Sequence, residues 1–366
     1  MKKLILLLFI PYVIIAQDFK IEHKVNDDKT VDFSYKNLSP NTITVIVNFS
    51  FLENTMSSTR VVEKVSKPEG KLFRLKPMNN EQNIGFNYSY LFFNHNINPK
   101  VDDDFVYILP YKKETQMFVE ELSYLGSTYS DKEEPKGWKS YSFSSDEVQK
   151  IFPVRKGVVI DVVRDYGVDT TKIFTYYNKM NSVKIEHNDG TLALYSGFNK
   201  DEIYVNIGDI VYPKYNALGK TEIYDARKKH RINFSLFYYS TKNGIKLSSL
   251  SKNNQTEIIY ITPTFYQNGK SVKLKKDFFY ESDYDELVCG GNLVGYYGKT
   301  CAYDSNGLRT PTMYYHMYDE LVFLCLGPVF RYYGSSRIVL VVLVQYYGSL
   351  ALLVDGPQCP NNDHKP

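Results

Sequence analysis

Histidine and acidic side chains are the residues of this sequence that could bind a metal ion or transfer a proton. A hydrolytic zinc site needs about three N, O or S ligands and an open position for water, whose pKa the metal lowers. His187 stands beside an Asp-Gly turn, where a hydrogen bond within the turn is the expected role. His23 and His95 each stand alone in strand-and-turn segments, so we expect surface or hydrogen-bonded residues. Asp161 and Asp165 could be paired carboxylates, but their strand and turn favour surface charge.

Other catalytic patterns are missing from the sequence, and its cysteines are confined to the last segment. There is no Gly-x-Ser-x-Gly, no phosphate-binding glycine loop and no His-Glu-x-x-His. The four cysteines form no Cys-x-x-Cys pair, which argues against a zinc knuckle, and in an exported protein they could form two disulfides with three possible connectivities. They are Cys289, Cys301, Cys325 and Cys359.

The cysteine-containing segment differs in composition from the rest of the chain. After Val288, lysine remains only at Lys299 and Lys365. We therefore expect residues 289–366 to form an atypical tail of separate origin, such as a frameshifted or fused terminus. A disulfide-bearing final module is the alternative. Residues 338–354 are mostly apolar but are interrupted by polar residues and glycine, so we expect no membrane span in the mature chain.

The N-terminus predicts export. Residues 1–16 combine two lysines, an apolar run and a final small residue, which is the layout of a signal peptide, so the mature chain would begin near Gln17. An uncleaved anchor is the alternative. The predicted location is the periplasm or the cell exterior of a bacterium. The 44 Lys and Arg nearly balance the 41 Asp and Glu, which argues against a nucleic-acid partner.

The remaining sequence of the 366-residue chain predicts an all-β fold. The 33 Tyr and 22 Phe favour sheet over helix. Short alternating segments, such as Phe19–Glu22 and Ile43–Val47, predict a β-sandwich-like module over residues 17–110. A second β-rich domain is expected over 111–270 and a charged linker over 271–288. The clearest element of the second domain is a hairpin at Asp189-Gly190. Around this turn, Val183, Ile185, Leu192 and Leu194 alternate with polar or small residues.

The second domain resembles the lysostaphin and LytM type of zinc endopeptidases, which cut the peptide cross-links of bacterial cell walls. The resemblance covers roughly 90 residues and depends on the order and spacing of several short segments. The first two are a strand with a Gly-Val-Val step at 153–159 and a strand, Asp-Gly turn and Leu-x-Tyr strand at 183–195. The others are a Val-x-x-Gly-Asp-x-Val turn at 205–211, a Leu-Gly step at 217–219 and the end of a strand at 232–234. The resemblance implies a LytM-like β-sheet of the duplicated hybrid type. Biotinyl and lipoyl carrier domains share the Gly-Asp-x-Val turn, but their Met-Lys-Met sequence is missing.

The residues at the family's functional positions depart from the family pattern. The family's first zinc ligand, a histidine, falls on Asp131, and its aspartate ligand falls on Ser142. The histidine of a Tyr-x-His segment becomes Gly197, and a His-x-His pair becomes Arg231 and Asn233. Glycine has no side chain, arginine is a permanent cation, and serine and asparagine are poor zinc ligands. The resemblance therefore implies a degenerate site with no confident catalytic or metal-binding residue and no expected cofactor.

Three functions follow from this pattern. The first is an exported, catalytically inactive relative that binds peptidoglycan or regulates a cell-wall hydrolase. The second is an active zinc endopeptidase with an atypical site, for which Asp131, His230 and His187 are the candidate metal-site residues. His230 is offset by one residue from the family pair, and on a strand this offset turns a side chain to the opposite face. The third is a structural surface β protein.

Overall fold

The computed structural model describes residues 19–126, 133–173, 175–176, 179–251 and 255–282. It also gives the backbone of four short strands further along the chain, which are β21 (Cys301–Tyr303), β22 (Arg309–Pro311), β23 (Leu343–Tyr346) and β24 (Ser349–Leu352). The predicted all-β class is confirmed, because strands in several sheets build the described chain and its two described 3-10 turns, η2 (Lys242–Gly244) and η3 (Leu247–Ser249), have three residues each. The predicted signal peptide and tail disulfides lie outside the described residues.

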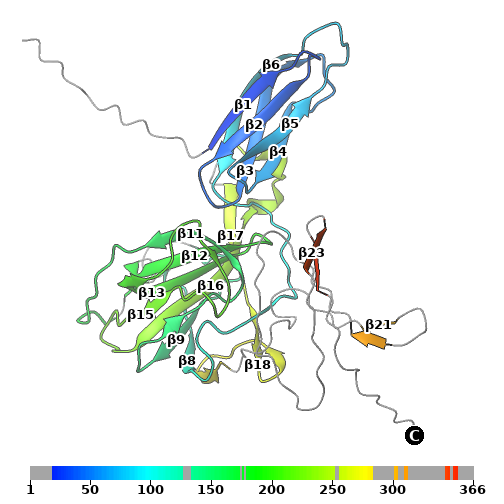
Figure 1. Ribbon diagram of the computed structural model, residues 1–366. Coiled ribbons are helices and arrows are strands. Elements are labelled where there is room, and N and C mark those ends of the chain that lie inside the picture. Colours follow the sequence, from blue (N-terminus) through cyan, green and yellow to red (C-terminus); the bar gives the residue numbers. More distant parts are fainter. Residues whose placement is uncertain are drawn as a thin grey trace, which may run out of the picture. The chain divides into compact units, whose positions relative to one another are not determined.

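Residues 19–93 contain two three-stranded antiparallel sheets, drawn in blue to cyan in Figure 1. One sheet has the order β1 (Phe19–Val25), β2 (Val31–Asn37), β5 (Glu69–Leu75). The other has the order β4 (Arg60–Val65), β3 (Ile43–Glu53), β6 (Gly85–Phe93). Both share one hydrophobic cluster, in which the ring of Phe33 lies 5.7 Å from that of Phe49 and 5.1 Å from that of Tyr88. The alternating apolar residues of the sequence therefore meet between the two sheets.

A sheet of eleven strands is the largest element of the described residues after Phe93. Its main path has the order β14-β11-β12-β13-β16-β9-β8-β20; β10 pairs with β15, which also pairs with β13, and β17 pairs with β16. The strands are β8 (Gln116–Glu121), β9 (Tyr141–Ser145), β10 (Lys150–Ile151), β11 (Gly157–Val163), β12 (Asn181–His187), β13 (Leu192–Ile203), β14 (Ile210–Val211), β15 (Gly219–Thr221), β16 (His230–Thr241), β17 (Thr256–Ile261) and β20 (Phe278–Glu281). A small sheet contains β7 (Val106–Tyr107), β18 (Thr264–Gln267) and β19 (Lys270–Val272).

The hairpin expected at Asp189-Gly190 joins β12 and β13. The N–H of His187 donates to the Thr191 carbonyl at 2.9 Å, and Gly190 has a positive φ of 83°. The register sets Val183 opposite Tyr195 and Ile185 opposite Ala193, and all four side chains are buried in the main core. The core face of β13 thus carries Ala193 and Tyr195, whereas Leu194 lies opposite Lys184 on the other face. The turn length fixes this register, and a register fixes which face each side chain takes.

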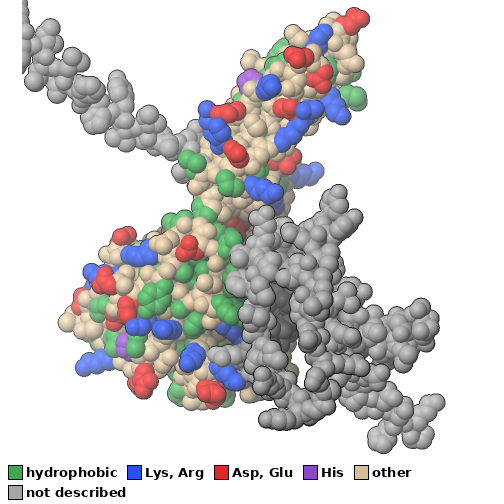
Figure 2. Space-filling view, in the orientation of Figure 1, with side chains coloured by type: hydrophobic (Ala, Val, Ile, Leu, Met, Phe, Trp, Pro, Cys, Tyr) green, Lys and Arg blue, Asp and Glu red, His purple; other side chains and the backbone are tan. Residues whose placement is uncertain are grey.

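The chain divides into two compact units, residues 1–284 and 285–366. Within the first unit, the backbone N–H of Thr42 donates to Glu186 Oε2 on β12 at 2.7 Å, and the His95 ring stacks on Tyr239 with centroids 3.7 Å apart. No helix among the described residues is long and apolar enough to cross a membrane. On the face shown in Figure 2, acidic and basic side chains are interspersed over the described surface.

Candidate functional site on the polar face of the sheet

Along the first half of strand β16, one face of the large sheet is apolar and the other is polar. Ile232, Phe234 and Leu236 belong to the main hydrophobic core. The alternate residues Arg231 and Asn233 are also buried, at 2% and 7% exposure, but they face the other side. This second face contains the positions at which the sequence predicted a degenerate site.

A row of polar side chains crosses this second face. Asn233 is paired with Ser142 of β9 on one side and with Ser196 of β13 on the other. Directly paired residues of antiparallel strands place their side chains on the same face. We call Ser196, Asn233 and Ser142 the polar row. It brings together three residues that are at least 37 positions apart in the sequence.

Gly197 lies next to Arg231 because β13 contains a β-bulge at this point. The register with β12 skips from Ser196 to Phe198, so that Gly197 is the extra residue, and its φ is 128°. A Cβ atom on Gly197 would lie 2.4 Å from the carbonyl oxygen of Arg231. The Gly197 carbonyl accepts a 2.9 Å hydrogen bond from the N–H of Glu222. The bulge therefore both requires glycine and anchors the loop after β15.

That loop places Asp225 against Arg231 in a buried ion pair. Arg231 Nη1 donates to Asp225 Oδ1 at 3.1 Å, and Nη2 donates to Oδ2. The Asp225 side chain is only 1% exposed, and it also accepts from the Thr175 N–H at 3.2 Å and from Arg227 Nε at 3.3 Å. Burial raises the pKa of Asp225, but the hydrogen bonds from Arg231 and Arg227 outweigh burial and hold this pKa below its ordinary value. Asp225 is therefore a carboxylate at neutral pH.

Tyr224 fastens the loop beside the ion pair. Its hydroxyl donates to the Phe198 carbonyl at 2.6 Å and accepts from Asn181 Nδ2 at 2.6 Å. Burial raises the pKa of Tyr224 to about 12, so the phenol stays protonated and keeps this donor. Met180 contacts the polar row at Asn233, with its sulfur 3.5 Å from Asn233 Nδ2. These contacts bury the polar face and hold the ion pair in one arrangement.

The residues of this face do not fit a zinc ion. Zinc sites in proteins use Cys, His, Asp and Glu. The mapped positions that the structure describes supply a serine, a glycine, an arginine and an asparagine, and the carboxylate of Asp225 is already paired with a permanent cation. Ser142 Oγ, Asn233 Oδ1 and Arg231 Nε are buried without a hydrogen-bond partner in the described part of the chain. Across the same residues, no three His, Cys, Asp or Glu side chains gather as a metal site would require.

The other candidate metal-site residues lie elsewhere. His230 pairs with Ser145 at the start of β16, and strand alternation puts it on the side of Ile232, away from the polar row. His187 is 2% exposed at the hairpin turn, where its Nδ1 lies 2.8 Å from Thr191 Oγ1. Asp131 lies outside the described residues. The structure therefore brings Ser142, Gly197, Arg231 and Asn233 together, and it separates His230 from them.

Burial and charge explain the state of the hairpin histidine. Burial, aided by the positive charge of Arg155, lowers the pKa of His187 to about 3, although Asp189 acts in the opposite direction. Arg155 Nη1 lies 2.6 Å from Asp189 Oδ2, and Asp189 Oδ1 accepts from the Thr191 hydroxyl at 2.7 Å. His187 is thus a neutral residue of the turn. Asp161 forms a partly exposed ion pair with Lys184 at 3.1 Å.

The remaining carboxylate and the two N-terminal histidines have other surroundings. Asp165 is exposed. His23 is exposed, and its Nδ1 lies 3.3 Å from the Tyr88 hydroxyl. Burial lowers the pKa of His95, which stacks on Tyr239, to about 4.

A second feature of the large sheet is a groove beside β14, with both polar and apolar side chains in its lining. The groove has a volume of about 530 Å³ and is lined by residues that include Tyr204, Asp209, Ile210, Tyr215 and Asn216. Tyr215 is 74% exposed, Ile210 is 50% exposed and Tyr204 is 47% exposed. Exposed apolar side chains that gather around a hollow are typical of a surface that binds a partner. We call these residues the β14 groove.

Sequence reasoning missed three residues that define the polar face. Asp225, Tyr224 and Asn181 carry the ion pair and its support, but none belongs to a short motif. The only signal in the sequence was Arg231 within an expected strand. If its guanidinium is buried, an acidic partner must lie nearby. Comparisons with models of protein families, with curated proteins and with solved structures found no match.

Proposed function

We propose that this protein is an exported, catalytically inactive relative of the lysostaphin and LytM type endopeptidases, and that it binds the bacterial cell wall or regulates a wall hydrolase. The order of the resembling segments supports the relationship. The convergence of Ser142, Gly197 and Asn233 around one point of β16 supports it further, since these positions correspond to functional residues of the family. Their residue types support the loss of catalysis.

The observation that carries the proposal is the Arg231–Asp225 ion pair. A hydrolytic zinc ion needs anionic or neutral ligands and one open coordination position. Arg231 instead brings a permanent cation to this face, and Asp225, the carboxylate nearest to it, neutralises that cation. Two like charges in a buried site repel strongly because the effective dielectric constant is low there. The arrangement favours a retained scaffold over a hydrolytic centre.

Binding requires a surface other than the closed polar face, and the β14 groove is our proposed surface. It combines exposed apolar side chains with the carboxylate of Asp209 and the amide of Asn216. Polar groups at such a hollow orient a ligand, and the apolar groups add buried area. Peptide stems of peptidoglycan and an extended segment of a hydrolase both offer suitable polar and apolar groups.

The direct experiment mixes the purified protein with insoluble peptidoglycan, with and without added Zn²⁺. We expect the protein to sediment with peptidoglycan and to release no soluble peptide fragments under either condition, as measured by mass spectrometry. Adding a wall hydrolase then tests regulation, which would appear as a changed rate of fragment release. Zinc-dependent release by the protein alone would contradict the proposal.

Two further outcomes would favour the alternatives. Stoichiometric zinc in the purified protein, lost in His230→Ala, would support an active endopeptidase with an atypical site. A complete lack of binding to peptidoglycan and to wall hydrolases would favour a structural surface protein.

A further inference from the structure

Strand β6 has a free edge in the described part of the chain. It is the last strand of the sheet β4-β3-β6, so that only β3 pairs with it among the described residues. It is nine residues long, and its register with β3 runs from Thr44–Phe93 to Glu53–Gly85. A long free edge exposes a row of unpaired N–H and C=O groups, which can pair with another strand.

The sequence of β6 lacks the protection that the other edge strands of this module carry. Natural proteins discourage edge-to-edge pairing by placing charged side chains or proline on free edges. The three other edge strands are charged, with lysine, arginine or glutamate at Lys20, Glu22 and Lys24 in β1, at Arg60, Glu63 and Lys64 in β4, and at Glu69, Lys71 and Arg74 in β5. In contrast, β6 reads Gly-Phe-Asn-Tyr-Ser-Tyr-Leu-Phe-Phe and contains neither a charge nor proline.

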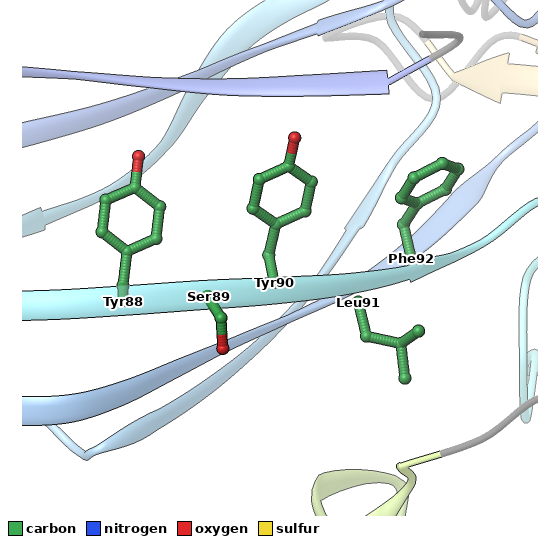
Figure 3. A pocket seen from close by; sticks show the side chains of 5 residues that line it. All are labelled: Tyr88, Ser89, Tyr90, Leu91 and Phe92. Carbon is green, nitrogen blue, oxygen red and sulfur yellow. The ribbon is translucent and has the colours of Figure 1, made fainter.

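A groove follows this edge. It has a volume of about 690 Å³ and is lined by five consecutive residues, Tyr88 to Phe92. Figure 3 shows the rings of Tyr88, Tyr90 and Phe92 in a row on one side of the strand and the side chains of Ser89 and Leu91 on the other. A groove that is lined by consecutive residues of one strand, on both of its faces, has the shape that an added strand would fill.

The aromatic row is anchored on its inner side and still partly exposed. The Phe19 ring of β1 lies 6.2 Å from the ring of Tyr90 and 5.4 Å from that of Phe92. All three rings of the row pack against the hydrophobic cluster of this module without being fully buried. Additional apolar area is therefore available for burial when another strand pairs with β6.

We propose that β6 pairs antiparallel with β6 of a second copy of this chain, about a two-fold axis at Tyr90. This register sets Tyr88 opposite Phe92 and Ser89 opposite Leu91 in each half of the interface. Paired residues share a face, so all six rings lie on one side of the joined sheet and form aromatic cross-strand pairs.

The second copy is the occupant that the residues favour. A two-fold antiparallel pairing sets each strand against its own sequence, so a charge near the axis would lie close to its own copy, and β6 has no charge at any position. The same pairing sets aromatic residues against aromatic residues along the whole row. Each copy also supplies the complementary edge at the same concentration as the site.

Sedimentation velocity of the full chain over a micromolar to millimolar concentration range tests the proposal. We expect a monomer–dimer equilibrium whose dissociation constant rises at least about tenfold in Ser89→Lys, a change of about 1.4 kcal/mol. Ser89 is exposed and points away from the rings, so the substitution leaves the core intact, while each new ammonium group lies diagonal to its symmetry copy. Ser66→Lys, at an exposed position outside β6, is the matched control and should keep the wild-type constant.

Hydrogen exchange locates the interface. Amides of residues 85–93 should become more protected as the protein concentration rises, while those of β4 should not change. A chain that stays monomeric over the whole range would overturn the proposal. A dimer that Ser89→Lys does not weaken, or protection at a different strand, would also overturn it, as would a monomer whose β6 edge is protected only by a foreign extended peptide. Circular dichroism of both variants checks that they are folded.

Discussion

Arg231 on β16 and Asp225 in the preceding loop form a two-pronged ion pair in which both side chains are almost completely buried. The pair lies beside the polar row, on the face where the family resemblance would place a metal centre. Its net charge is zero, and Thr175 and Arg227 donate further hydrogen bonds to the carboxylate. A buried ion pair of this kind fixes the structure around it, because either partner alone is costly to bury.

Removing the acidic partner should destabilise the protein strongly. In Asp225→Ala the guanidinium of Arg231 stays buried without a counter-charge, and the free energy of unfolding should fall by about 3–5 kcal/mol. Urea denaturation followed by tyrosine fluorescence measures this change. Arg227→Ala is the matched control, because Arg227 is 43% exposed and its ion pair should contribute less than about 1 kcal/mol. A loss below 1 kcal/mol in Asp225→Ala would show that water reaches the guanidinium.

The effect of Asp225 also depends on pH. Because the pKa of Asp225 is lower in the folded protein than its ordinary value of 3.8, the carboxylate stabilises the fold above that pH. The stabilisation is lost as the pH falls through the folded-state pKa. The difference between the wild type and Asp225→Ala should therefore shrink on acidification.

The bulge at Gly197 should tolerate no side chain. Gly197→Ala would place a Cβ atom 2.4 Å from the Arg231 carbonyl oxygen, at a φ of 128°. We expect a loss of about 3 kcal/mol or more, because backbone strain and overpacking combine. Gly208→Ala is the matched control: its φ is 95°, but no atom lies within 4 Å of the added Cβ. The control should lose only about 1 kcal/mol, and equal losses in urea denaturation would contradict the crowding argument.

Local signals in the sequence predicted the hairpin and the faces of β16, but not the closure of the polar face. Asp189-Gly190 determines a turn within four residues, so the β12–β13 hairpin could be anticipated. Strand alternation alone predicted that His230 faces away from Arg231 and Asn233. In contrast, the pairing of Asp225 with Arg231 depends on the loop after β15, which the bulge at Gly197 anchors through tertiary contacts. The core position of Tyr195 depends on a register that the apolar pattern left open.

Protonation of the unfolded chain at His187 should make stability depend on pH. The imidazole is buried and neutral in the folded protein, with a pKa of about 3, while its ordinary value is 6.5. Between these values the unfolded state binds a proton that the folded state does not, so stability falls as the pH is lowered. The expected slope is about 1.4 kcal/mol per pH unit.

A pair of variants isolates this contribution. His187→Asn removes the titrating group and should flatten the dependence of the unfolding free energy on pH. Between pH 6.5 and about pH 5 it should abolish a loss of roughly 2 kcal/mol. Thr191→Val removes the hydroxyl near Nδ1 but keeps the buried imidazole, so it should lower stability while preserving the slope. Urea denaturation over this pH range distinguishes them. An unchanged slope in His187→Asn would mean that the imidazole can be protonated in the folded protein.

The C-terminal unit should be dispensable for the stability of the first. The chain divides at residues 284 and 285, close to the change in lysine and cysteine usage that the sequence shows after Val288. We expect a protein truncated after Tyr284 to remain soluble, with a thermal unfolding midpoint within a few degrees of the full chain, as measured by calorimetry. An unfolded or aggregated product would instead indicate a disulfide-bearing module that is part of the fold.

Substitutions in the β14 groove should weaken binding to peptidoglycan or to a wall hydrolase without changing stability. In Ile210→Ser/Tyr215→Ser, two exposed apolar side chains are replaced by small polar ones, and such losses at the centre of an interface reduce affinity about tenfold or more. Phe278→Ser is the matched control, since Phe278 is 56% exposed on β20, at the other end of the sheet path from β14. Co-sedimentation with peptidoglycan over a range of protein concentrations gives the affinities. Neither variant removes a buried contact of the core, so both should stay folded. If the double variant and the control bind equally well, binding occurs at a different surface.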